Sequence, residues 1–444
     1  MSAVPATATA STSLSKRLVL LLMAAASVGY VCRVAVTVVA PNMMGEFGLT
    51  QTQMGTVFSA FLLGYTLFQV PSGGLADRVS ARHIFLFLCT GWAVLTVFTA
   101  LVGWQGFGLA MAIPQLWVIR AIFGVIAAPT YPTSGRTIAI TMPPRLQARA
   151  NSLVLASVGV GSAVTPLLLA PITSRYGWRT ALLVAAFLSA AAGLLWLRFG
   201  PRELHTHATP SVPVAAQSTA TESPKNSAQP LRLPSFWFLS ASYLLQGYLG
   251  YIFIFWFYLY LVQVRHFEVL KAASFTALPW IATTFAIPLG GFFSDWAVIH
   301  WGATWGRRSV PLAALSAAAI FLVVGARTPK PMVAVAALTT CTVLVLCTEG
   351  PFWATMTQLS GEHSGIAGGT MNFGSNLGGM VSPALTPWLA ARIGWESALT
   401  LTAGLAVVAG LLWLGVRVES SPESDLRSAD SRSTSTPTSV DLRE

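Results

Sequence analysis

The sequence predicts an all-α integral membrane protein whose twelve transmembrane helices form two six-helix repeats. Three observations support this fold class. Apolar residues make up 54% of the 444 positions and charged residues only 9%, whereas a soluble chain carries about 25% charged residues. Twelve apolar runs follow one another, each near the roughly 20 residues that cross a hydrocarbon core. The two halves of the chain also repeat each other.

The repeat is defined by five residue pairs, each separated by the same 217 residues. They are Gly161 and Gly378, Pro166 and Pro383, Gly177 and Gly394, Trp178 and Trp395, and Trp196 and Trp413. A second echo lies near the start of each half, where residues 73–78 are answered by residues 291–296. Like-oriented halves of apolar helices are typical of transporters that rock two halves around a central site.

The apolar runs divide the chain into two membrane halves. The predicted spans are 18–40, 53–73, 84–104, 113–135, 150–172, 180–198, 236–262, 273–294, 310–326, 332–357, 364–388 and 396–416. We therefore expect a disordered N-terminus (1–17), an N-terminal six-helix half (18–200), a cytoplasmic linker (201–234), a C-terminal six-helix half (235–417) and a disordered C-terminal tail (418–444). The linker is rich in Pro, Ser, Thr and Ala, a composition that favours a flexible chain.

The net charge of +11 follows from membrane topology rather than from nucleic-acid binding. Most Lys and Arg residues fall in segments predicted to face the cytoplasm, as the positive-inside rule requires. We therefore expect a lipid bilayer and no nucleic acid as partners, with both termini in the cytoplasm and the chain in a bacterial inner membrane. The run from residue 18 to 40 exceeds the core of a signal peptide and is taken as the first span.

Motifs of enzymes and metal sites are missing from the sequence. It contains no Gly-rich phosphate loop ending in Lys, no His pair at metal spacing and no nucleophile elbow. The four Cys residues lie in apolar runs without metal-ligand spacing. We expect no enzyme activity, no cofactor and no bound metal, so any transport must draw on ion gradients.

A charged motif lies in the loop between the second and third predicted spans. It reads Gly-x-x-x-Asp-Arg-x-Ser-x-Arg from Gly73 to Arg82, with a weaker copy around Asp295. Its glycines permit close helix packing, and Asp77 can pair with an Arg or accept hydrogen bonds at a helix terminus. The motif resembles the signature loop of the major facilitator superfamily. The resemblance implies a gating role for Asp77, Arg78 and Asp295.

Four further stretches narrow the resemblance. They are residues 30–47, 65–73, 120–136 and 369–383. Together they resemble the anion:cation symporter branch of that superfamily, which includes bacterial hexuronate, galactonate and glucarate permeases. The resemblance implies transport of a small organic anion, commonly a hexuronate, aldonate or aldarate, with H⁺ symport. The sequence does not define an oligomeric state, and we expect a monomer.

Two arginines lie inside predicted spans, Arg33 in the first and Arg120 in the fourth. A central Arg costs about 2.5–3.5 kcal/mol on insertion scales and persists mainly where it faces a cavity or a partner. Its planar fork matches a carboxylate. The resemblance assigns Arg33 to the substrate carboxylate and Arg120 to coupling and gating. Alternatively, either side chain snorkels to an interface or pairs internally.

Polar and aromatic residues complete the expected substrate site. Asn372 and Asn376 lie four apart on one helical face and can bind sugar hydroxyls, or alternatively join helices. Tyr30 and Tyr65 are expected to meet the first-span arginine, and Trp353 could wall a sugar ring. Plain packing is the alternative for these aromatic residues.

The residues expected to couple transport to protons depart from the family pattern. Proton-coupled members carry Asp before the first-span Arg and Glu before the fourth-span Ala-Pro, whereas this chain has Cys32 and Ala127. Glu349, in the tenth span, remains as a deep carboxylate, and burial favours proton uptake by such a group. Alternatively, Glu349 pairs with an Arg or is solvated. An anion exchanger or uniporter therefore remains an alternative to a symporter.

Two other functions fit the same fold. A transporter-like membrane sensor would need a signalling partner domain, but the linker and the tail are short and plain. An exporter of amphipathic drugs would need an acidic, aromatic cavity, whereas the charge inside the predicted spans is mainly basic.

The predicted topology can be tested with single cysteines introduced into residues 201–234 of a chain without its native cysteines. A membrane-impermeant maleimide applied to intact cells should not modify them, because this segment is expected in the cytoplasm. A cysteine replacing Tyr176, in a loop expected outside, should be modified. Labelling of the linker from outside would contradict the twelve-span arrangement.

Overall fold

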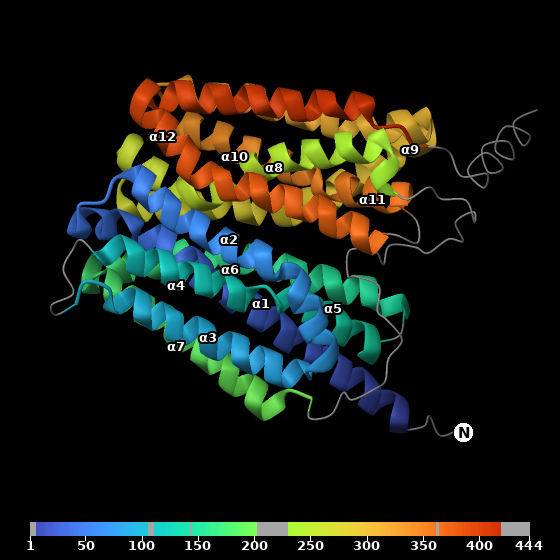
Figure 1. Cartoon of the computed structure of the whole chain (residues 1–444), viewed down its shortest axis with the longest axis horizontal. Helices are drawn as coiled ribbons and strands as arrows, with labels where there is room; N and C mark the ends of the chain where they lie inside the picture. The colour runs from blue at the N-terminus through green and yellow to red at the C-terminus, as the bar shows by residue number, and fades with distance from the viewer. Residues whose placement is uncertain (1–5, 105–110, 143, 202–229, 361–363, 419–444) are drawn as a thin grey trace, which may run out of the picture.

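The computed structural model describes residues 6–104, 111–142, 144–201, 230–360 and 364–418. Within these ranges every regular element is a helix, which confirms the predicted all-α fold. Figure 1 shows the helices of the first half, blue to green, lying together beside the helices of the second half, yellow-green to red. Most of the predicted linker and nearly all of the predicted tail lie outside the described residues.

The first half is built from helices that follow the predicted spans. They are α1 (Ala6–Phe47), α2 (Gln51–Arg78), α3 (Ala81–Leu101), α4 (Ala112–Ala127), α5 (Thr130–Thr141), α6 (Pro144–Tyr176) and α7 (Trp178–Phe199). α1 begins inside the stretch for which disorder is predicted. α2 begins at a capping box, in which Thr50 and Gln53 exchange hydrogen bonds. α4 and α5 form one broken span, because Pro132 has no N–H for the carbonyl of Ala128.

The second half is built in the same way. It contains η3 (Pro230–Arg232), α8 (Pro234–Leu259), η4 (Tyr260–Val264), α9 (Val269–Arg327), α10 (Pro331–Cys347), α11 (Glu349–Ser360), α12 (Ser364–Leu412) and η6 (Trp413–Gly415). α9 and α12 each hold two predicted spans, because Gly302 (φ 78°) and Gly394 (φ 81°) break the helix. Nine helices among the described residues are long and apolar enough to cross a membrane. With these two breaks and α2, the arrangement is consistent with twelve spans.

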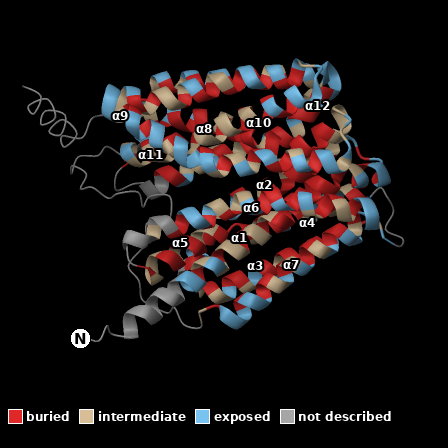
Figure 2. Cartoon of the chain, turned by 180° about the vertical axis from the view of Figure 1, so that it is seen from behind, coloured by how far each residue is buried: buried red, intermediate tan, exposed pale blue. Residues whose placement is uncertain are grey.

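The helix ends define two ends of the bundle. At the linker end lie Arg78, Thr141, Phe199, Leu233 and Ser360, and at the far end lie Phe47, Gln51, Tyr176, Val264 and Gly394. Figure 2 shows buried residues between the helices and exposed residues on their outer faces. Many exposed side chains are large and apolar, such as Phe187 and Ile299. Such an outer surface is suited to lipid, because its side chains are apolar and the backbone groups of each helix are hydrogen-bonded within that helix.

The sequence repeat is confirmed as a repeat of helix packing. A Cβ atom on Gly161 would lie 2.3 Å from the carbonyl oxygen of Ser27, and one on Gly378 would lie 2.0 Å from that of Leu244. Ser27 and Leu244 are themselves repeat partners, 217 residues apart. Equivalent pairs of helices, α1 with α6 and α8 with α12, are therefore in backbone contact in the two halves, because glycine has no side chain to separate them.

The repeated tryptophans at the far end differ in their partners. Trp178 donates its indole N–H to Glu46, at 2.7 Å, within the first half. Its repeat partner Trp395 donates instead to the Oε1 atom of Gln51, at 3.1 Å, across the two halves. The Nε2 atom of Gln51 in turn donates to Gln263, at 2.9 Å. Gln51 therefore joins α2 to both η4 and α12.

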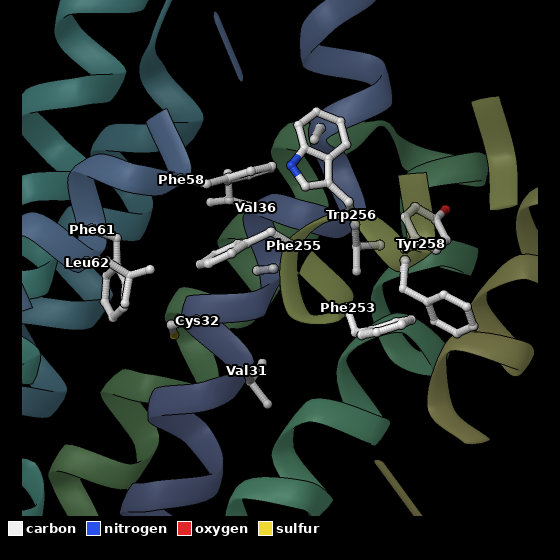
Figure 3. Packing of buried hydrophobic residues seen from close by; sticks show 14 of the residues in the cluster. Val31, Cys32, Val36, Phe58, Phe61, Leu62, Phe253, Phe255, Trp256 and Tyr258 are labelled. Carbon is white, nitrogen blue, oxygen red and sulfur yellow. The ribbon is translucent and has the colours of Figure 1, made fainter. Parts of the chain in front are cut away.

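Packing near the far end holds the two halves together. A Cβ atom on Gly55 would lie 1.9 Å from the carbonyl oxygen of Pro383, so α2 and α12 touch through their backbones. Figure 3 shows Phe58 of α2 close to Phe255 and Trp256 of α8, and the rings of Phe58 and Phe255 stack at 5.1 Å. These contacts lie within two helical turns of the α2 N-terminus.

At the linker end, the glycines of the signature loop do not make the close helix contacts that the sequence predicts. A Cβ atom on Gly73 or Gly74 would meet no heavy atom within 4 Å. The prediction is wrong for this conformation, because α2 is in backbone contact with the second half near Gly55 and not at its other end.

The glycine contacts predict unequal effects of two Gly→Ala substitutions in α12. Gly378→Ala should lower the melting temperature of the purified protein, because the methyl group meets a backbone oxygen and overpacking costs about 1–3 kcal/mol. Gly404→Ala is the matched control, because its Cβ would meet no atom within 4 Å. Thermal unfolding in one detergent measures both. Equal melting temperatures would contradict the packing role of Gly378.

Candidate functional site

Arg33 lies about two-thirds of the way along α1, with 5% of its surface exposed. Its Nη1 atom donates a hydrogen bond to the Tyr30 hydroxyl at 3.0 Å. The Nε and Nη2 atoms are buried and have no partner within the described residues. These two nitrogens share one edge of the planar guanidinium, the edge that can bind both oxygens of a carboxylate. The Tyr251 hydroxyl lies near the guanidinium, but no group in the described residues accepts from this edge in hydrogen-bond geometry, so the fork is unused.

Aromatic rings surround this guanidinium. Its central carbon lies 4.4 Å from the ring centre of Phe61, 5.0 Å from that of Tyr30 and 5.5 Å from that of Tyr251. Ring faces attract cations, so these contacts offset part of the cost of burying the charge. Tyr251 belongs to α8, so the second half also reaches the Arg33 side chain.

A small cavity of about 20 Å³ lies beside Arg33, which is room for about one water molecule. Its walls come from α1 to α5, and its lining residues are Ala26, Gly29, Tyr30, Arg33, Phe61, Tyr65, Trp92, Phe123, Ala127, Thr130 and Tyr131. The polar groups among them are the guanidinium, three phenols, one hydroxyl and the indole N–H of Trp92. That N–H is buried and has no partner within the described residues. The predicted residues Tyr30, Arg33 and Tyr65 are thus brought together.

Arg120 lies against Arg33 on α4 and is only 1% exposed. Its Nη2 atom donates to the backbone carbonyl of Arg33 at 3.1 Å, and its Nε atom has no partner within the described residues. Its central carbon lies 5.3 Å from the ring centre of Phe61. Neither arginine snorkels to an interface. No ion pair within the described ranges includes either one.

The two family positions that lack a carboxylate lie in different surroundings. Cys32 is fully buried, and its thiol donates to the carbonyl of Ala185 on α7 at 3.5 Å, away from the cavity. Ala127 lines the cavity itself. A carboxylate at position 127 would therefore face Arg33, but the chain provides only a methyl group there.

A chain of polar contacts links the two halves beside Arg33. The Tyr251 hydroxyl donates to the Oδ1 atom of Asn376 at 3.0 Å. The Nδ2 atom of Asn376 donates to Gln69 on α2 at 3.3 Å and to the carbonyl of Asn372 at 3.0 Å. Asn376 therefore joins helices in this conformation, which is the alternative left open by the sequence. Asn372 is partly exposed.

Glu349 forms a separate cluster in the second half. It starts α11, where Pro351 breaks the span formed by α10 and α11. The Tyr243 hydroxyl donates to its Oε2 atom at 2.8 Å, and the Nε2 atom of Gln246 donates to Oε1 at 2.9 Å. No arginine pairs with it in the described part of the chain. Trp353 packs edge-on to Tyr243 at 6.2 Å and does not line the Arg33 cavity.

The structure describes more side-chain contacts for the second copy of the loop motif than for the first. Arg78 ends α2 and is exposed, while the side chain of Asp77 lies outside the described part of the structure. In the second copy, Arg307 pairs with Asp295 at 2.6 Å and contacts Gln358 of α11 at 3.4 Å. The ion pair joins the two parts of α9 on either side of the break at Gly302. The contact of Arg307 with Gln358 connects α9 to α11. Within the described residues no group of three His, Cys, Asp or Glu could hold a metal ion.

Several residues of the site are not predicted by the sequence. Trp92 and Tyr131 line the cavity beside Arg33, and the Tyr251 ring contacts its guanidinium, while Tyr243 and Gln246 hold Glu349. Tyr243, Gln246 and Tyr251 all lie on α8. One signal was available in the sequence, since Tyr243 and Gln246 lie three positions apart and so share one face of α8.

Two like halves with a buried cationic cavity beside their interface define the class of multi-pass membrane transporters. The chain belongs to the Major Facilitator Superfamily, whose family model matches residues 20–383 and 359–440. Members of this family are transporters, and the protein is accordingly not an enzyme.

Curated relatives cover most of the chain. A probable sulfoacetate transporter of Cupriavidus necator is 28% identical over 374 residues, which is 83% of this chain and 85% of that protein. The hexuronate transporter of Bacillus subtilis is 25% identical over 402 residues, covering 88% and 92%. The D-galactonate transporter of Escherichia coli is 27% identical over 405 residues, covering 87% and 91%.

A solved structure shares the fold. It is a bacterial homologue of the human lysosomal transporter Spinster in an inward-facing, occupied conformation, with a TM-score of 0.74. The match covers 90% of this chain and 96% of that one, at 19% sequence identity. This likeness supports the arrangement of the helices.

Proposed function

We propose that the protein is a secondary transporter of a small organic anion, which it moves by alternating access of its two halves. The unused guanidinium fork of Arg33, buried beside a cavity and without a carboxylate partner in the described ranges, carries this proposal. Leaving charged donors unpaired in an apolar interior is costly. A bound oxyanion would offset that cost.

The substrate class that fits best is a sugar acid such as a hexuronate, an aldonate or an aldarate. The phenols of Tyr30, Tyr65 and Tyr131 can both donate to and accept from sugar hydroxyls. Phe61 and Trp92 offer apolar faces for the C–H side of a sugar. Two curated relatives are a hexuronate transporter and a D-galactonate transporter, and a third is a probable sulfoacetate transporter, which supports a small organic anion as the substrate.

In this proposal the second half completes the site when the halves close around the substrate. Asn376 already contacts Gln69 across the halves. Asn372 and Trp353 would approach the substrate from the second half, on the same side as Asn376. The ion pair of Asp295 and Arg307, together with Asp77 and Arg78, would act as a gate that closes or opens the linker end. Arg120 would couple movement of α1 to movement of α4 through its hydrogen bond to the Arg33 carbonyl.

The location of the protein follows from the same proposal. We place it as a monomer in the bacterial inner membrane, with the termini and the linker in the cytoplasm. The contacts at Gln51 and Gly55 then close the outer side of the transporter. The conformation is accordingly one that faces the cytoplasm, as in the solved structure with the same fold.

Proton coupling through Glu349 is the finer part of the proposal. As a carboxylate, Glu349 accepts one hydrogen bond from Tyr243 and one from Gln246. Protonation turns one oxygen into a donor, so this arrangement must change when a proton binds. Anion exchange or uniport is the alternative, because Cys32 and Ala127 leave no carboxylate beside the arginines. A transporter-like sensor would bind the anion without moving it.

Substitution of Arg33 tests the anion site. Arg33→Lys should weaken uptake of a sugar acid by about tenfold or more, because an ammonium group keeps the charge but loses the planar fork. Arg33→Ala should abolish uptake. The measurement is uptake of labelled anion into proteoliposomes. Arg175→Lys, at an exposed position of α6, is the control and should transport normally. Normal uptake by Arg33→Ala would remove Arg33 from the site.

Substitution of Glu349 tests the coupling. Glu349→Gln mimics the protonated form, so accumulation driven by a pH gradient should be lost while counterflow exchange persists. Exchange survives because it requires no net movement of protons. Glu268→Gln, on the exposed Glu268–Lys271 pair, is the matched control. Loss of both activities would assign Glu349 a structural role, and accumulation by the native protein that ignores the pH gradient would contradict proton symport.

A further inference from the structure

We propose that the preferred substrate is a small dianion, a molecule with two oxyanion groups such as a dicarboxylate or a sulfonate that also bears a carboxylate. The inference rests on the proposed function and narrows its substrate class. It follows from the charge of the site, which holds two buried arginines and lacks an acidic partner for either within the described residues.

The two cations form one electrostatic unit. Their central carbons lie 4.4 Å and 5.3 Å from the same Phe61 ring centre, and Arg120 donates to the backbone carbonyl of Arg33. At such separations, and away from water, the charges repel each other. A bound monoanion neutralises one of them and leaves the other without a counter-ion. A dianion neutralises both.

Acidic groups elsewhere do not supply the missing charge. Glu349 is the deep carboxylate of the second half, but it lies in a separate cluster with Tyr243 and Gln246 and forms no ion pair with either arginine within the described residues. The thiol of Cys32 points to a carbonyl on α7, and Ala127 contributes a methyl group to the cavity wall. The second negative charge is therefore left to the ligand.

The hydrogen-bonding groups of the site also favour an oxygen-rich anion. Four buried donor atoms have no partner within the described residues, namely Arg33 Nε, Arg33 Nη2, Arg120 Nε and Trp92 Nε1. The three phenols of the cavity can act as either donors or acceptors. Each carboxylate or sulfonate group offers several lone pairs, so one group can accept from the Arg33 fork and the other from the phenols of the cavity. The second group need not touch Arg120, since Coulomb attraction acts over several ångströms in a low dielectric.

Binding of matched anions to the purified full-length protein tests the inference. D-glucarate and D-gluconate share a six-carbon chain and differ in having two or one carboxylates, and sulfoacetate and acetate form a second pair. Isothermal titration at neutral pH in chloride-free buffer should show each dianion binding about tenfold or more tightly than its monoanion. Affinities of the two forms within about twofold of each other would overturn the inference.

Variants separate the roles of the two charges. Arg120→Gln should remove most of the preference for the dianion, so that the ratio of the dianion affinity to the monoanion affinity falls to within about twofold. Ala127→Asp should also remove the preference, because it provides a negative charge inside the cavity. Ala127→Asn has the same shape without the charge and should retain it. An Ala127→Asn variant that loses the preference as fully as Ala127→Asp would overturn the electrostatic explanation.

The remaining outcomes distinguish this inference from the proposed function. Tight binding of monoanions with no gain for dianions would overturn the inference alone and leave an anion transporter. A monoanion affinity that rises to that of the dianion when chloride is added would also overturn it, since an inorganic ion would then supply the second charge. Binding of none of the four anions, with the protein folded by thermal unfolding, would overturn the proposed function as well.

Discussion

The unpaired guanidinium of Arg33 is the constraint on which the organisation of the site depends. A charge in the middle of an apolar bundle requires compensation, and this chain compensates it with ring faces from Phe61, Tyr30 and Tyr251 instead of a carboxylate. Arg120 fixes the α1 backbone at the same residue. The surrounding helices thus hold Arg33 in place while its binding edge stays free.

The two halves share their packing but divide the chemistry between them. The glycine contacts at Gly161 and Gly378 are equivalent, so the duplicated scaffold persists in both. The two buried arginines of the site belong to the first half, whereas the deep carboxylate Glu349 belongs to the second. Tyr251 and Asn376 connect these two regions. The two halves therefore share the glycine contacts at these positions and differ in the charged residues beside the interface.

Much of the fold and the centre of the site could be predicted from the sequence, because apolar runs and an intramembrane Arg are local signals. Tyr30 could be placed beside Arg33 from helical spacing alone. The contributions of Trp92 and Tyr251 could not, since they depend on how each helix is rotated and on which half it meets. The contacts of Gly73 depend on the conformation of the transporter, which sequence does not specify. Trp353 was expected at the Arg33 cavity but lies with Glu349, because α11 starts a separate cluster.

The different partners of Trp178 and Trp395 have an energetic consequence for the resting state. The bond from Trp178 to Glu46 stays within one half, so it is present whichever way the halves tilt. The bonds of Gln51 to Trp395 and Gln263 exist only while the far end is closed. Each contributes about 0.5–1.5 kcal/mol, so together they favour the form closed at the far end over the open form by about fivefold to more than a hundredfold. One glutamine thereby acts on the balance between conformers and not on whether the chain folds.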